Sequence, residues 1–103
     1  MTTAPTIAEG TAIRSPVRFT EVLQAVRRSG GSTVAVSERD ITTAVGLLAR
    51  MGLYAEPTSA VAAAAAEKLL ASGTITPEQR TVVLLTGSGL KATAFMTELF
   101  GKA

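Results

Sequence analysis

The chain has 103 residues, a formal net charge of +2 and only four aromatic side chains, so it can form one small domain with an aliphatic core. It contains no cysteine and no histidine, which excludes a disulfide framework, thiolate-bound metal and a catalytic triad that depends on histidine. Its ten Lys and Arg residues are scattered apart from Arg27 and Arg28, which argues against nucleic-acid binding.

Neither the N-terminus nor the apolar runs indicate membrane attachment. The first ten residues lack the basic and apolar regions of a signal peptide. The alanine-rich run at residues 59–66 is far shorter than the ~20 residues that span a bilayer. We therefore expect a cytoplasmic protein that binds no metal, no membrane and no nucleic acid.

The first predicted element is a helix over residues 15–29. Ser15 is a candidate cap, Pro16 occupies a first-turn position, and Gly30 follows the last turn. Four apolar residues recur at helical spacing on one face: Phe19, Val22, Leu23 and Val26.

A short strand and a second helix follow. A short strand is expected around residues 34–36. Ser37 and Asp40 have the spacing of a capping box, in which the two side chains bond to each other's backbone N–H groups at a helix start. The second helix should therefore begin after Ser37 and end at Gly52.

The second half of the chain predicts a helix, a turn, a strand and a last helix. The residue before Pro57 is expected to be extended, and the alanine-rich helix after it should end near Gly73. Residues 76–79 predict one short turn, and residues 81–85 form a continuous apolar run typical of a strand. A final helix fits in the residues from Ala92 onward.

The order helix, strand, helix, helix, strand, helix indicates an α/β protein. A strand such as residues 81–85 is normally buried on both faces of a parallel sheet, yet the chain supplies only two strands. We therefore expect an incomplete three-layer parallel sheet with flanking helices. The chain should belong to a larger domain, or complete its sheet with another chain in an oligomer.

The stretch GSGLKA fits the spacing G-x-G-x-x-A through Gly87, Gly89 and Ala92. A dinucleotide site needs a second strand and an acidic residue about 20 positions further on, and only eleven residues follow Ala92. Two interpretations stay open. The glycines either provide positive φ in a structural turn, or let the backbone approach a ligand.

The segment AEPTSA offers a similar choice. Glu56 could be a carboxylate in a pocket, or it could cap the helix that begins at Pro57. Thr58 and Ser59 are expected to be caps, since no histidine is present to activate them. Lys91 lies at a helix start and lacks the apolar surroundings of a reactive amine.

Four blocks together resemble the C-terminal part of threonine synthase and its relatives, the pyridoxal-phosphate (PLP) enzymes of the tryptophan-synthase β-like family, fold type II. They occur in the order and approximate spacing of that family and cover nearly the whole chain. The blocks are PTIAEGTAI (5–13), SGGSTVAVSERDI (29–41), GLYAEPTSA (52–60) and VVLLTGSGLK (82–91). The resemblance implies that residues 1–103 are the C-terminal portion of such an enzyme domain.

This resemblance also implies three cofactor-binding residues. Thr86 would hold the ring nitrogen of PLP through its hydroxyl and leave that nitrogen largely unprotonated, and Gly87 would let the chain pass close to the ring. Glu56 would face the cofactor pocket, with residues 8–10 near the face of the ring.

The resemblance assigns no catalytic residue to this chain. The Schiff-base lysine and the glycine-rich cup for the cofactor phosphate belong to an upstream segment, and Lys91 matches a different lysine of the family, in TGxGLK. Ser88 and Ala92 stand where threonine synthases commonly have histidine and aspartate, whereas Glu9 favours threonine synthase over the ADG of threonine ammonia-lyase and serine racemase.

Three functions therefore remain open. The first is part of a lyase that converts O-phosphohomoserine to threonine and phosphate. The second is a segment of a threonine or serine dehydratase. The third is a non-catalytic module, truncated or split from such an enzyme, that docks to a partner chain supplying the missing strands.

Overall fold

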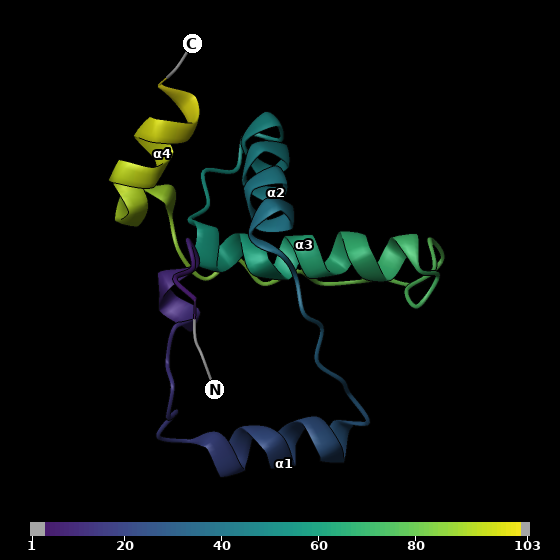
Figure 1. The fold of residues 1–103 in the computed structure, drawn as a ribbon. Coiled ribbons are helices and arrows are strands. Elements are labelled where there is room, and N and C mark those ends of the chain that lie inside the picture. The colour runs from purple at the N-terminus through teal and green to yellow at the C-terminus, as the bar shows by residue number, and fades with distance from the viewer. Residues whose placement is uncertain (1–3, 102–103) are drawn as a thin grey trace.

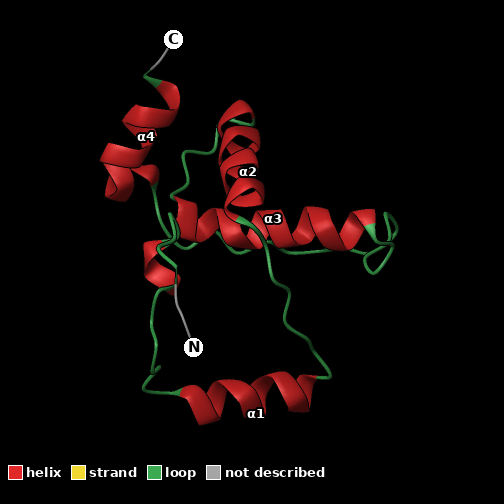
Figure 2. Ribbon diagram, in the orientation of Figure 1, coloured by secondary structure: helices red, strands yellow, loops and turns green. Residues whose placement is uncertain are grey.

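The computed structural model describes residues 4–101, and among them it contains helices and no strand (Figures 1 and 2). No helix in this range is long and apolar enough to cross a bilayer. The elements are the 3₁₀ helices η1 (Glu9–Thr11) and η2 (Gly89–Ala92) and the α-helices α1 (Phe19–Ser29), α2 (Glu38–Arg50), α3 (Pro57–Ala71) and α4 (Thr93–Phe100).

The core lies between α2 and α3, which cross near the first half of α3 (Figure 1). Helix α3 contributes mainly alanine, whose small side chain lets the two helix backbones approach closely. Burying each of the larger side chains contributes on the order of 1.5–3 kcal/mol. The buried apolar residues are Ile41, Ala44, Val45 and Leu48 on α2, Ala60, Ala63 and Ala64 on α3, and Ala8, Ala55 and Met96 around them.

The capping box at the start of α2 is confirmed. Ser37 Oγ accepts a hydrogen bond from Asp40 N at 3.2 Å, and Asp40 Oδ2 accepts one from Ser37 N at 2.9 Å. Next to it, the carboxylate of Glu38 accepts hydrogen bonds from the Thr6 hydroxyl and from Ile7 N. These bonds stabilise the charged forms, so the pKa values of Asp40 and Glu38 lie below their ordinary range. They also join the N-terminal segment to α2.

Helix α1 begins one turn later than the sequence predicts. Its first residue is Phe19, and no side chain caps it. Pro16 O instead accepts a hydrogen bond from Phe19 N at 3.2 Å, which closes a turn ahead of the helix, so the prediction of Ser15 as the cap is wrong. No residue of α1 is buried, and the helix lies apart from the others in Figure 1.

All three predicted helix ends are confirmed by glycines with positive φ. Gly30, Gly52 and Gly73 have φ values of 67°, 81° and 72° directly after α1, α2 and α3 or one residue beyond. Glycine adopts this conformation without steric cost, and the helices stop there.

The two expected strands are not formed among the described residues. In residues 34–36 the carbonyl of Ala35 accepts a hydrogen bond from Lys68 Nζ of α3 at 2.8 Å instead of from a neighbouring strand. Residues 81–85 are extended, but the structure gives their backbone no bond to another strand. A strand requires a neighbour about 4.8 Å away, and the described chain places none beside either segment. The only pairing resembling a sheet among residues 4–101 is an isolated antiparallel bridge between Ala55 and Ser88.

The capping box allows a direct test of stability. We expect Ser37→Ala to lower the free energy of unfolding by about 1 kcal/mol, because the backbone N–H of Asp40 at the start of α2 loses its partner. Ser32→Ala is the matched control, since Ser32 is exposed in the segment before the cap. Urea unfolding followed by circular dichroism measures both, and equal midpoints would contradict the prediction.

The lowered pKa values predict an acid dependence of stability. Asp40 and Glu38 are charged at neutral pH and stabilise the fold there. This contribution is lost as the pH falls through their lowered pKa values, below about pH 4. The melting temperature should therefore fall less steeply with acid in the Glu38→Gln, Asp40→Asn double variant than in the native chain. Parallel pH profiles would contradict the role of these carboxylates.

Candidate functional site

Two segments far apart in the sequence meet at the N-terminal end of α3. Glu56 N donates to Gly87 O at 3.1 Å, and Gly89 N donates to Tyr54 O at 2.9 Å. These two hydrogen bonds flank the bridge between Ala55 and Ser88. The turn that follows residues 81–85 is therefore anchored beside the start of α3.

Ser59 lies beneath this turn and is 1% exposed. Its Oγ accepts hydrogen bonds from Thr86 N at 3.0 Å and from Gly87 N at 2.6 Å. It also lies 3.1 Å from Gly87 O and 3.2 Å from Thr86 Oγ1. Ser59 was expected to cap its own helix, and that prediction is wrong. Its position two residues after Pro57 gave no signal that it would bind a distant turn.

Glu56 occupies the N-cap position of α3, but its side chain makes no capping hydrogen bond. The carboxylate lies over Gly87, where the Cβ atom of any other residue would overlap it. The structure thus brings together two of the three predicted site residues, and it holds the third, Thr86, to the same turn through Ser59.

The glycines of the turn serve close approach and not unusual backbone angles. Neither Gly87 nor Gly89 has positive φ, so that interpretation of GSGLKA is wrong. A Cβ atom on Gly89 would lie 2.8 Å from both Tyr54 Cζ and Met96 Cε. Gly89 is itself buried, whereas Gly87 is half-buried.

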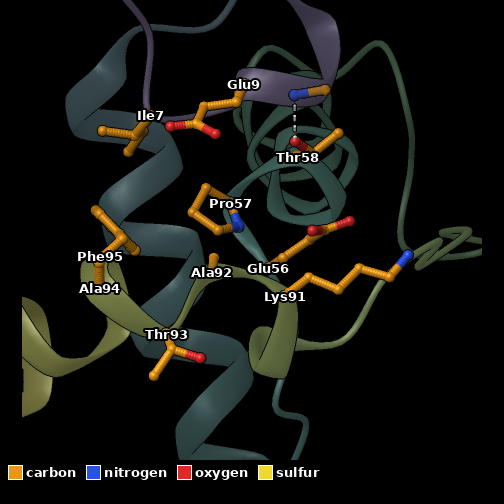
Figure 3. A pocket seen from close by; sticks show the side chains of 11 residues that line it. Ile7, Glu9, Glu56, Pro57, Thr58, Lys91, Ala92, Thr93, Ala94 and Phe95 are labelled. Atoms are coloured by element: carbon orange, nitrogen blue, oxygen red, sulfur yellow. Dashed lines mark hydrogen bonds between the residues drawn. The ribbon is translucent and has the colours of Figure 1, made fainter.

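Residues 8–10 also lie against the start of α3. Gly10 N donates to Thr58 Oγ1 at 3.1 Å, which Figure 3 shows as a dashed line. Thr58, like Ser59, therefore binds a distant segment instead of capping its own helix. In this way η1 and Glu9 are placed near Pro57.

A hollow of about 380 Å³ lies between η1, the start of α3 and η2 (Figure 3). The side chains of Glu56 and Lys91 extend toward the same side in Figure 3, while the Glu9 side chain extends from η1 near Pro57. Thr86 and Gly87 are not among its lining residues. Of the predicted site residues, Glu56 alone therefore faces the hollow, and the Thr86 side is open to solvent.

Within residues 4–101 no group of three acidic side chains is gathered in a way that could hold a metal ion. The functional groups near the turn are the Thr86 hydroxyl, the Glu9 and Glu56 carboxylates, the Lys91 amine and the backbone N–H groups of residues 87–89.

Comparison with known proteins bears on this arrangement. Residues 1–87 match the family model described as pyridoxal-phosphate dependent enzyme. The chain belongs to this family. This result confirms membership of the pyridoxal-phosphate dependent enzymes, which the four sequence blocks indicated. The match covers three of the four blocks completely.

The chain is similar to several proteins named threonine synthase. The chain is 42% identical to the one from Methanocaldococcus jannaschii over 87 residues, which are 84% of this chain and 22% of that protein. It is 38% identical over the same length to those from Methanosarcina acetivorans and Halalkalibacterium halodurans. The matched part is thus about a quarter or less of these relatives.

The two glycines of the turn should respond differently to substitution. In Gly87→Ala the nearest atoms to the new Cβ belong to the Glu56 side chain, which is flexible and can move, so we expect little loss of stability, within about 0.5 kcal/mol. Gly89→Ala presses on Tyr54 and the buried Met96, and should cost roughly 1–3 kcal/mol. Urea midpoints compare the two variants, and equal losses would contradict the assigned contacts.

Proposed function

We propose that this chain forms the part of a PLP-dependent lyase that holds the pyridine edge of the cofactor. The complete enzyme is a threonine synthase, which converts O-phosphohomoserine to threonine and phosphate. The observation that carries the proposal is the turn at residues 86–89, where an exposed threonine stands next to a glycine that a carboxylate overlies. The names of the relatives support threonine as the product, and the resemblance of the sequence blocks implies the substrate.

The Thr86 hydroxyl fits a ring nitrogen. It is neutral and belongs to an exposed residue, and it lies 3.2 Å from Ser59 Oγ, which also accepts from the Thr86 backbone N–H. Next to it the Glu56 side chain lies over Gly87, so a flat ring can approach the backbone there once this flexible side chain moves aside. When bound, PLP supplies an electron sink for carbanion chemistry, and the protein binds and orients it. Thr86 would hold its ring nitrogen, and Glu56 would border the ring beside Gly87.

The remaining cofactor contacts are assigned to the part of the relatives that this chain does not cover. We place there the lysine that binds the cofactor and the cup for its phosphate. This assignment leaves Lys91 without a covalent role, in keeping with its exposed position at η2.

The same remainder would complete the parallel sheet. Along residues 81–85 exposure alternates, with Val82 at 83% and Leu84 at 71%, while Val83 is 37% exposed and Leu85 is half-buried. An extended segment with free backbone groups and apolar side chains on both faces is suited to a central strand. We propose that residues 34–36 and 81–85 become strands when the remainder provides their neighbours. The oligomeric state and the cytoplasmic location stay predictions.

The free strand edge also favours the second candidate, a non-catalytic module that docks to a partner chain. The two candidates differ in what accompanies this chain in the cell. The native product from source cells should have an intact mass well above the 10.6 kDa of this chain, and should release phosphate from O-phosphohomoserine. A mass that matches the short chain, together with a co-purifying partner, would instead favour the module. Release of ammonia from threonine or serine would indicate a dehydratase.

The role of Thr86 has its own test. In the native enzyme we expect Thr86→Ala to weaken PLP binding roughly tenfold and to change the cofactor absorbance, because one hydrogen bond to the ring is lost. Thr81→Ala is the control, since Thr81 is an exposed threonine five residues earlier on the same segment. An unchanged spectrum and rate in Thr86→Ala would remove that residue from the site.

A further inference from the structure

We infer that Lys91 is a positioning residue that holds the Glu56 carboxylate away from Gly87 when the ring of PLP is bound. Neither the family match nor the names of the relatives assign this lysine a role. The inference rests on the proposed function, because it concerns the space beside Thr86 that the ring would enter. It names the residue that clears this space, which the proposed function does not specify.

The starting observation is that a side chain fills the place proposed for the ring. A Cβ atom at Gly87 would lie 2.5 Å from Glu56 Cδ and would overlap Glu56 Oε1. A flat ring that lies against the backbone of Gly87 needs the same space. The Glu56 side chain and the ring therefore cannot both lie over Gly87, and the ring must displace the side chain.

Only the side chain of Glu56 can leave, because its backbone is held on both sides. Glu56 N donates to Gly87 O at 3.1 Å, and Glu56 O accepts from Ala60 N at 3.0 Å. The side chain is half-buried, makes no capping hydrogen bond and makes no ion pair among residues 4–101. Rotation about its side-chain bonds can thus clear Gly87 while the backbone stays in place.

The hollow that Glu56 lines provides the destination. Lys91 lines the same hollow, and the two side chains extend toward the same side in Figure 3. Of the described residues around the hollow, Lys91 alone carries a positive charge, whereas Glu9 is a second carboxylate. A carboxylate that leaves Gly87 is therefore attracted by Lys91 and repelled by Glu9, so Lys91 determines where it goes.

The backbone fixes the position of Lys91 relative to the turn. Lys91 N donates to Ser88 O at 3.1 Å, and Leu90 N donates to Ser88 Oγ at 3.2 Å, so η2 starts directly from the turn. The Lys91 side chain is exposed and makes no ion pair among residues 4–101. Its amine can therefore pair with Glu56 without giving up another partner. An exposed pair of this kind shifts an equilibrium only a few-fold.

The experiment follows PLP binding to the native enzyme through the cofactor absorbance, and it measures both the association rate and Kd. We expect Lys91→Met to raise Kd roughly threefold, mainly through slower association, because the arrangement that admits the ring becomes less populated. Lys91→Arg should keep Kd within about twofold of the native value, since the charge is retained. Arg50→Met is the matched control, because it removes one exposed positive charge at the end of α2.

The decisive comparison removes the side chain that must move. In Glu56→Ala nothing of residue 56 beyond Cβ remains to cover Gly87, so adding Lys91→Met should change PLP binding no more than adding Arg50→Met does. An equal loss with and without Glu56 would show that Lys91 contacts the cofactor directly, which would overturn the inference. It would also be overturned if Lys91→Met bound PLP as tightly and as fast as Arg50→Met. If Lys91→Met does not fold, Lys91→Gln provides the same comparison with a neutral polar side chain.

Two further outcomes separate this inference from the proposed function. A native enzyme that binds no PLP would overturn both. A native enzyme that binds PLP and loses affinity in Thr86→Ala but not in Lys91→Met would overturn only the role of Lys91.

Pyridoxal, which lacks the phosphate, tests whether Lys91 acts on the space for the ring. Lys91→Met should weaken the binding of pyridoxal by the same factor as the binding of PLP, because both present the same ring to Gly87. A loss seen with PLP alone would mean that Lys91 binds the phosphate, and it would overturn the inference.

Discussion

The hydrogen bonds of the Ser59 hydroxyl are the interaction on which the site depends. They join the first turn of α3 to the turn at residues 86–87, which lies 27 residues further along the chain. The backbone bond between Glu56 and Gly87 and the bond between Tyr54 and Gly89 add to this junction. Because Ser59 is buried, removing its hydroxyl would leave the backbone N–H groups of Thr86 and Gly87 without their acceptor, and an unpaired buried N–H group is destabilising.

Steric freedom at Gly87 and Gly89 is the second constraint. Both glycines have ordinary backbone angles, so the reason for glycine is what lies against them: the Glu56 carboxylate at Gly87, and Tyr54 and Met96 at Gly89. A site that must admit a flat ring next to the backbone benefits from the same absence of side chains. At Gly87 this space is taken by the Glu56 side chain, which would have to move aside for the ring.

The helices and their ends were predictable because their signals are local. The capping box at Ser37 and Asp40 and the stops at Gly30, Gly52 and Gly73 act within a few residues. The expected strands were not seen, since pairing is non-local and depends on neighbours that residues 4–101 do not provide for residues 34–36 and 81–85. Thr86, Gly87 and Glu56 were named from a resemblance, whereas Ser59 carried no mark in the sequence that set it apart from a helix cap.

By itself the sequence determined the apolar face of α2, the start of α2, the ends of α1, α2 and α3, and the family, because apolar spacing, a capping box, glycines and motif order are local features of the chain. Only the tertiary structure decided which side chains meet. It placed Glu56 over Gly87 and put the Ser59 hydroxyl under Thr86. These contacts join residues far apart in the chain. Their geometry depends on how α3 packs against α2 and on the path of the returning segment, and neither is encoded in any one stretch of residues.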